Sequence, residues 1–344
     1  MPGGQKPGAA MIRVGGEGET GRRNQAIDSL RGLLVLAVIA GHYYELSDRH
    51  GFLAWLGAGV RMPLFIGLAG YLFNLESART RPLTSTLRKY GQRLIIPWAV
   101  ACAVYLTSAT QLTPLSLLTV PLRPPFHFWF VPVMMTFILI AALSRRSPLA
   151  MLGVAIPISI AAMYMLGVQH VIQQGFAAWL PDRRFFIYPI YFFYGLWVAQ
   201  RRQDRTKLYA ALALAPIGLL WWCTLYVHPS IPGEVAASLI TSLSLICLLP
   251  GIRSASLVLP LIGGIGRQSL FFYLWHPMVF ALWSSSGVIG MSMLLLSIAT
   301  LFAGCALLAR SDAASRVFGI TRRRHRPPVE AMAFEPIPLR ERNA

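Results

Sequence analysis

Two polar residues, Arg31 and His42, interrupt an otherwise apolar segment at residues 27–46, IDSLRGLLVLAVIAGHYYEL. A charged arginine in the hydrocarbon core of a membrane costs at least about 2.5 kcal/mol, so such residues are usually retained for a reason. An imidazole can act in acid–base chemistry near neutral pH, whereas a guanidinium stays protonated and binds oxyanions. The ordinary alternative is an arginine that snorkels to the interface beside an interfacial histidine.

The spacing of the pair places both side chains on one helix face. Eleven residues at 100° per residue make about 1100°, or three turns and a further 20°, and separate the two side chains by about 16 Å along the axis. Asp28 precedes Arg31 by one turn, where it can cap the helix and pair with the guanidinium. Glu45 follows His42 by one turn, where a carboxylate can fix the tautomer of the imidazole.

The composition indicates that the segments carrying these residues lie in a lipid bilayer. Hydrophobic residues make up 55% of the chain, charged residues 13%, and the mean hydropathy is +0.55. Apolar runs long enough to span a membrane recur along the sequence, which predicts an all-α polytopic protein with ten transmembrane helices. The predicted spans are residues 27–46, 53–75, 92–109, 126–143, 149–167, 184–200, 208–227, 235–250, 267–285 and 287–309.

The distribution of basic residues predicts the orientation of these spans. Most of the 31 Lys and Arg fall in the loops that are cytoplasmic if the N-terminus is inside, as the positive-inside rule requires. Both termini of this multi-pass protein are therefore predicted to be cytoplasmic. The same distribution explains the net charge of +18, so nucleic acid is not an expected partner and membrane lipid is.

The chain is predicted to hold one folded domain between two flexible ends. Residues 1–24 are rich in glycine and charge, residues 25–310 carry the ten spans, and residues 311–344 form a basic, proline-containing tail. The four cysteines fall in apolar spans without metal-ligand spacing, so no metal site is predicted: Cys102, Cys223, Cys247 and Cys305.

Five further residues are candidates for binding. Arg61 lies deep in the second span and precedes Pro63, which loosens the helix and frees backbone carbonyls. Its depth favours a ligand contact in a cavity over snorkelling to the interface. Arg93 begins the third span, where a positive-inside anchor and a phosphate contact are equally compatible with its position. His127 and Trp129 begin the fourth span, where aromatic belts are common but a sugar can also stack. His276 lies within the ninth span, where an interhelical hydrogen bond is the more frequent role of a lone histidine.

Several segments resemble the acyltransferase-3 family of integral-membrane acyltransferases, most closely its sugar O-acetylase branch. The Arg31 and His42 pair resembles the opening signature of the family. In the same order follow segments similar to other family motifs: MPLFIGLAGYLF (62–73), RLIIPW (93–98), FHFWFVPVMM (126–135) and IGRQSLFFYLWHP (265–277). Two positions depart from the pattern, because Ala69 stands where the family usually has Ser and Arg61 where this branch often has His.

The resemblance implies transfer of an acyl group, most often acetyl from acetyl-CoA, to a hydroxyl of a glycan or lipid-linked sugar. A sugar hydroxyl needs a base as it attacks a thioester, and His42 is the residue suited to that role, with Glu45 as its orienting partner by spacing. Arg31 would hold phosphate or carbonyl oxygens of the donor or stabilise the oxyanion, and Arg93 would contact the phosphates of CoA.

Two other classes of function use the same kind of residues. A transporter or flippase of a glycolipid or acyl-group carrier would need intramembrane polar residues along its pathway. A non-catalytic membrane sensor or scaffold is the third class. Loss of acetyl from a glycan on mutation of His42 indicates the enzyme, whereas impaired movement of a solute with unchanged acylation indicates the transporter.

Overall fold

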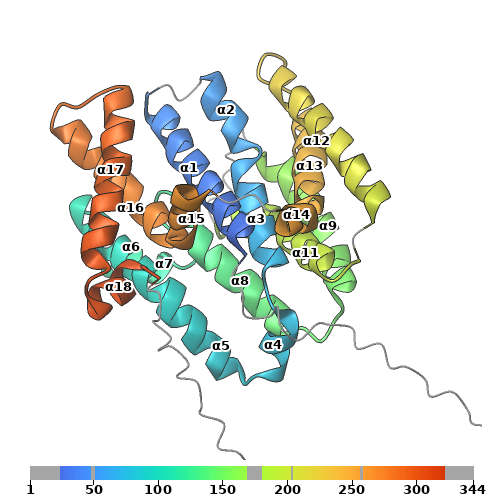
Figure 1. The fold of residues 1–344 in the computed structure, drawn as a ribbon, viewed down its shortest axis with the longest axis horizontal. Helices are drawn as coiled ribbons and strands as arrows, with labels where there is room; N and C mark the ends of the chain where they lie inside the picture. The colour runs from blue at the N-terminus through green and yellow to red at the C-terminus, as the bar shows by residue number, and fades with distance from the viewer. Residues whose placement is uncertain (1–23, 48–50, 169–179, 203, 256–258, 322–344) are drawn as a thin grey trace, which may run out of the picture.

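The computed structural model describes residues 24–47, 51–168, 180–202, 204–255 and 259–321 of the 344-residue chain. Throughout these ranges the regular elements are helices (Figure 1). The first half contains α1 (Gln25–Ser47), α2 (Phe52–Ala58), α3 (Arg61–Tyr71), α4 (Leu75–Thr80), α5 (Leu83–Tyr90), the π-helix η1 (Gly91–Ile95), α6 (Ile96–Ser108), α7 (Pro114–Thr119), α8 (Phe130–Leu143) and α9 (Pro148–Leu166). The second half contains α10 (Arg184–Ile187), α11 (Pro189–Ala199), α12 (Arg205–Thr224), α13 (Ile231–Cys247), α14 (Leu249–Ser254), α15 (Pro260–Arg267), α16 (Ser269–Ser285), α17 (Met291–Leu308) and α18 (Asp312–Phe318).

Several helices are long and apolar enough to cross a membrane, which supports an integral membrane protein. Six such segments lie in the described residues: Gln25–Ser47, Phe52–Tyr71, Pro148–Leu166, Arg205–Thr224, Ile231–Ser254 and Gly290–Leu308. The apolar helix Phe130–Leu143 is shorter. The all-α class is thus confirmed, while the count of ten spans and the cytoplasmic position of both termini stay predictions.

The second predicted span is divided into α2 and α3 and is not one continuous helix. Pro63 lacks an N–H group, so the carbonyl of Gly59 loses its intrahelical donor at this point. The hydroxyl of Ser242 donates to that carbonyl instead, at 3.4 Å. Gly59 also packs directly against the indole of Trp222, where an added Cβ would lie 2.4 Å from Cε2. The break places Arg61 at the first residue of α3.

Helix α1 lies in the middle of the bundle, with α16 and α17 on one side and α12 and α13 on the other (Figure 1). Its N-terminus is capped by Asn24, whose Oδ1 accepts from the backbone N–H of Ile27 at 3.0 Å, and not by Asp28 as the sequence predicted. The helix begins at Gln25, so the cap position falls on Asn24, and Asp28 is buried within the first turn. A carboxylate there is still favourable to the helix dipole.

Glycines allow α1 and α15 to cross at close range. A Cβ added at Gly32 would lie 2.0 Å from the backbone oxygen of Ile262, and one at Gly266 would lie 1.8 Å from that of Asp28. Helices in membranes commonly approach through such small residues. The crossing brings Arg267, the last residue of α15, to the end of α1 that carries Arg31.

A π-helical turn precedes α6 and includes Arg93. Pro97 cannot donate to the carbonyl of Arg93, and the N–H of Ile96 reaches back five residues to the carbonyl of Gly91. Such turns change the direction of the side chains that they carry and are frequent at functional sites.

The structure describes one helix, α18, after residue 310, where the tail was predicted to begin, and residues 1–23 and 322–344 of the two predicted flexible ends lie outside the described residues. Ser311 caps α18 by accepting from the N–H of Ala314, and Gly319 ends this helix in the left-handed conformation. The side chain of Gln268 then bonds both backbone groups of Thr321, at 2.7 and 2.9 Å. These hydrogen bonds hold the segment after α18 against the junction of α15 and α16.

Candidate functional site

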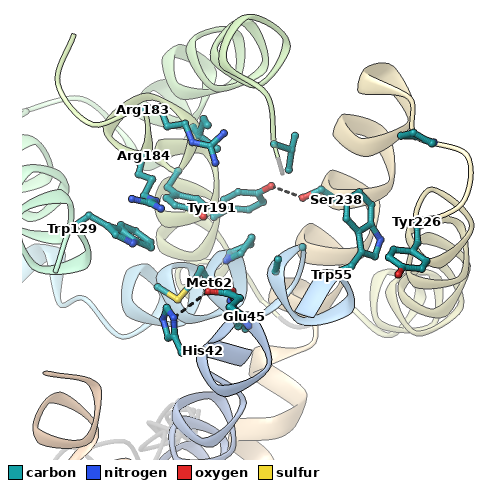
Figure 2. Close-up of a pocket in the computed structure, with 18 of the residues that line it drawn as sticks. His42, Glu45, Trp55, Met62, Trp129, Arg183, Arg184, Tyr191, Tyr226 and Ser238 are labelled. Carbon is teal, nitrogen blue, oxygen red and sulfur yellow. Dashed lines mark hydrogen bonds and ion pairs between the residues drawn. The ribbon is translucent and has the colours of Figure 1, made fainter. Parts of the chain in front are cut away.

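The candidate site is built around a cavity of about 830 Å³, called here the His42 pocket, whose lining includes His42, Glu45, Arg61, Trp129 and Tyr273. Figure 2 shows His42 and Glu45 on one side of this cavity and the two arginines of residues 183–184 on the opposite side. Its walls come from α1, α2, α3, α10, α11, α13 and α16 together with the residues that precede α8 and α10.

Glu45 joins His42 to Arg61 across the floor of the pocket. The Nδ1 atom of His42 lies 3.2 Å from Oε2 of Glu45, and the guanidinium of Arg61 donates to Oε1 of the same carboxylate. A carboxylate accepts hydrogen bonds, so Nδ1 carries the proton and Nε2 of the neutral ring carries the lone pair. His42 and Glu45 remain partly exposed, at 26% and 35%, whereas Arg61 is 7% exposed.

Arg61 occupies a slot between two glycines. A Cβ added at Gly41 would lie 1.4 Å from its Nη1 atom, and one at Gly57 would lie 3.2 Å from the same atom. Nη1 has no hydrogen-bond partner among the residues that the structure describes. The absence of a side chain at Gly41, one residue before His42, is therefore what allows the guanidinium to reach Glu45.

Two buried histidines complete a cluster with His42. The ring centroids lie 5.7 Å apart for His42 and His127, 5.2 Å for His42 and His276, and 5.2 Å for His127 and His276. Both inner rings are buried, and in the described part of the chain their Nε2 atoms lack hydrogen-bond partners. Nδ1 of His276 donates to the carbonyl of Phe272 at 3.0 Å, which leaves the lone pair on Nε2 in the neutral form.

Local backbone features direct these two histidines inward. Phe126 adopts a φ of 54° in the left-handed region and is exposed, and the chain turns there so that the next side chain, His127, enters the core. A non-glycine residue in this region costs on the order of 1 kcal/mol. In α16, Pro277 follows His276 and deprives the carbonyl of Tyr273 of its intrahelical donor, which loosens the helix beside the cluster.

An aromatic and cationic wall faces the cluster. The indole of Trp129 stacks on the ring of Tyr188, with centroids 5.2 Å apart and 20° between the planes. The guanidinium of Arg184 lies over Trp129 at 4.6 Å and pairs with Asp182 at 2.9 Å. Aromatic faces of this kind bind the apolar faces of sugars, while the charged edge can bind their oxygens.

Two further contacts fix the upper wall of the pocket. Arg183 donates through Nη1 to the carbonyls of Leu166 and Gly167, at 3.1 and 2.7 Å, and so caps the C-terminal end of α9. Burial lowers the pKa of Arg183, to which the neighbouring Arg184 also contributes, but a guanidinium remains protonated at physiological pH. The hydroxyls of Tyr191 and Ser238 are 3.1 Å apart and both line the cavity.

A second cavity, of about 260 Å³, is called here the Arg31 pocket. Four basic side chains contribute to its lining, and its described lining contains no carboxylate: Arg31, Lys89, Arg93 and Arg267. Apolar residues of α3, α8 and α16 also line it, together with Tyr90, Leu94, Ser269, Gly319 and Thr321. Tyr273 lines both this pocket and the His42 pocket.

The structure distributes the predicted site residues over these two cavities and the histidine cluster. Glu45, Arg61 and Trp129 line the pocket of His42, and Arg93 lines that of Arg31. His127 and His276 contact the ring of His42 and belong to neither of the two linings. Arg31 and His42 lie on one continuous helix, as predicted, but their side chains line different pockets.

Several site residues were not among those predicted from the sequence. Lys89 and Arg267 were attributed to the positive-inside pattern, which does not distinguish an anchor from a pocket residue. Tyr273 lies three residues before His276 in the segment IGRQSLFFYLWHP, a spacing that puts both residues on one helix face and could have indicated it. Nothing in the sequence indicated a role for Gly41 except its position next to His42.

Comparison with known proteins agrees with this architecture. The family model for the acyltransferase-3 domain, described as an acyltransferase domain, matches residues 24–310, which include α1 to α17 and nearly all residues of both pockets. Neither the curated proteins nor the solved structures gave a match. Because the matched region covers most of the chain, the protein belongs to the acyltransferase-3 family and is a membrane acyltransferase.

Proposed function

We propose that the protein transfers an acyl group, with acetyl as the assigned group, from acyl-CoA to a hydroxyl of a glycan or lipid-linked sugar. The observation that supports this proposal most is the contact between His42 and Glu45. It places the lone pair of His42 on Nε2, at the edge of a cavity large enough for a sugar residue.

In the proposed reaction, Nε2 of His42 takes the proton of the acceptor hydroxyl as its oxygen attacks the thioester carbonyl. The C–O bond forms, the C–S bond breaks, and the imidazolium returns the proton to the leaving thiolate of CoA. Glu45 stabilises the imidazolium and holds the ring, while Arg61 holds Glu45. General base catalysis of this kind contributes roughly 10²–10⁴-fold to a rate.

The Arg31 pocket is the proposed site of the acyl-CoA donor. Its four basic side chains suit the phosphates of CoA, since arginine binds phosphate oxygens through paired N–H groups. The cavity is small for a whole nucleotide, so we place the acyl-bearing arm in it and the nucleotide at its mouth. Arg31 and Arg93 are assigned to donor binding on this basis, and an oxyanion role for Arg31 is less well supported because it lies in the other pocket from His42.

The acceptor is assigned to the His42 pocket. Trp129 is buried in the wall of this pocket, where its indole holds Tyr188 and Arg184 in place, and Arg184 provides charged donors for the oxygens of a sugar. His127 and His276, which the sequence assigned to substrate binding, contact the ring of His42 from outside this lining and would act through that ring. Of the two departures from the family pattern, Arg61 acts through Glu45, and Ala69 lines the donor pocket.

We further propose that ten spans cross a bacterial inner membrane with both termini in the cytoplasm. The distribution of Lys and Arg supports this orientation. It places the Arg31 pocket towards the cytoplasm, where acyl-CoA is made, and the His42 pocket towards the outer side.

Mass spectrometry of cell-surface glycans tests the proposal. A deletion strain is compared with the same strain expressing wild type or His42→Ala at equal protein level. We expect the deletion and His42→Ala strains to lack an acetyl substituent that wild type restores. An unchanged acyl pattern in the deletion strain contradicts glycan acylation, and an altered distribution of an unmodified glycolipid across the membrane indicates a flippase.

A further inference from the structure

An aromatic partition separates the two pockets of the candidate site. Phe65 and Phe130 line the Arg31 pocket, Met62 and Trp129 line the His42 pocket, and Tyr273 lines both. His42 is absent from the lining of the first pocket, and Arg31 from that of the second. A donor held by the basic side chains and an acceptor held beside His42 therefore meet across this layer.

Tyr273 is held firmly within the partition. Its hydroxyl donates to the backbone carbonyl of His127, and its side chain is 4% exposed. Its ring lies 5.4 Å from the ring of Phe130 and 5.3 Å from that of His127, and Phe130 in turn contacts the ring of Phe65 at 5.2 Å. The layer thus joins α3, the start of α8 and α16 in one continuous set of ring contacts.

We propose that Tyr273 decides between acyl transfer and hydrolysis, because it lies between the two pockets and covers the donor pocket on the side from which water of the His42 pocket would reach the thioester. This inference rests on the proposed function, since it takes the two pockets as the donor and acceptor sites. It identifies a residue that determines the specificity of the reaction, and family membership alone does not identify that residue.

The chemical reason is that water and a sugar hydroxyl compete for the same thioester. If water reaches the thioester carbonyl, its oxygen forms the new C–O bond, the C–S bond breaks, and free acid and the thiol of CoA are released, with one proton of water passing to sulfur. His42 would assist water as readily as a sugar hydroxyl. A closed partition prevents this loss, as the exclusion of water does in other transferase sites.

The test measures release of CoA and transfer of acetyl on the same samples. Purified full-length protein in proteoliposomes receives [14C]acetyl-CoA, with or without envelope glycans from the deletion strain. Tyr273→Ala should raise CoA release without acceptor at least tenfold over wild type and lower the acetyl transferred per CoA released. Tyr273→Leu keeps more of the volume and should shift both quantities in the same direction by less.

Tyr209→Ala is the matched control, because this tyrosine of α12 is 68% exposed and lies outside the linings of both pockets. The Tyr209→Ala variant should transfer as much acetyl per CoA released as wild type does. If either folded variant at Tyr273 keeps the wild-type ratio of transfer to release, the partition role is overturned. If wild type itself transfers no acetyl from acetyl-CoA, the proposed function fails, so the two failures are distinguishable. Should Tyr273→Ala not fold, Tyr273→Leu decides the question alone.

Discussion

The imidazole of His42 and the carboxylate of Glu45 are joined within one turn of α1, with Nδ1 3.2 Å from Oε2. The other oxygen of the carboxylate accepts from Arg61, which is buried against Gly41. This arrangement fixes the ring and directs its second nitrogen away from the carboxylate. It is the geometry required of a histidine that removes a proton from a substrate.

Replacing Glu45 by Gln tests the orienting role of the carboxylate. The amide cannot stabilise an imidazolium, so we expect acetyl transfer to fall by about tenfold or more while protein level is unchanged. Initial rates with purified protein and acetyl-CoA measure this. Glu76→Gln on α4 is the control, since that residue is exposed and lies outside both pocket linings. A Glu45→Gln variant as active as the control would remove Glu45 from the mechanism.

Replacing Gly41 by Ala tests the slot that holds Arg61. The new Cβ would lie 1.4 Å from Nη1, so the guanidinium must move away from Glu45. We expect a loss of activity comparable to that of Glu45→Gln, measured by the same assay. Gly153→Ala in α9 is the control, because a Cβ there meets nothing within 4 Å, and alanine favours a helix by about 1 kcal/mol over glycine. Full activity of Gly41→Ala would show that this placement of Arg61 is not needed.

Replacing Arg267 by Gln tests the donor pocket. A hydrogen bond to a charged group contributes about 1.5–3 kcal/mol, so the KM for acetyl-CoA should rise by about tenfold or more. The KM for the acceptor should stay unchanged. Arg253→Gln on α14 is the control, since this exposed basic residue lies outside the pocket. An increase only in the KM for the acceptor would contradict the assignment of the Arg31 pocket to the donor.

Replacing Trp129 by Leu tests the acceptor wall. The change removes the surface on which Arg184 and Tyr188 stack, so the KM for the acceptor should rise several-fold, in keeping with about 1 kcal/mol for such contacts. Trp221→Leu on α12 provides the comparison, because that side chain is 41% exposed. If the KM for acetyl-CoA changed and that for the acceptor did not, the two pockets would have been assigned in the wrong order.

The sequence predicted the parts of the site that lie on single helices. The positions of Arg31 and His42 on one helix, and the contact of His42 with Glu45, follow from helical spacing alone. The all-α class follows from the length and apolarity of the segments. Pro63 indicated a weakened helix near the break between α2 and α3. The contacts of Gly59 with Trp222 and Ser242 at this break could not be predicted, because these residues are distant in sequence.

Contacts between helices account for what the sequence did not reveal. The pairing of Arg61 with Glu45 joins residues on α3 and α1, and it requires a glycine at position 41. The separation of Arg31 and His42 into two pockets depends on Tyr273, which α16 supplies. Periodicity within one helix carries no information on which helices become neighbours.

The rate of acetyl transfer by His42→Gln tests the central claim most directly. Purified wild type, His42→Gln and the exposed control His228→Gln are compared with [14C]acetyl-CoA and envelope glycans of the deletion strain. If His42 is the general base, transfer falls by about 10² or more in His42→Gln and is retained in His228→Gln. Transfer by His42→Gln at the rate of the control would contradict the account.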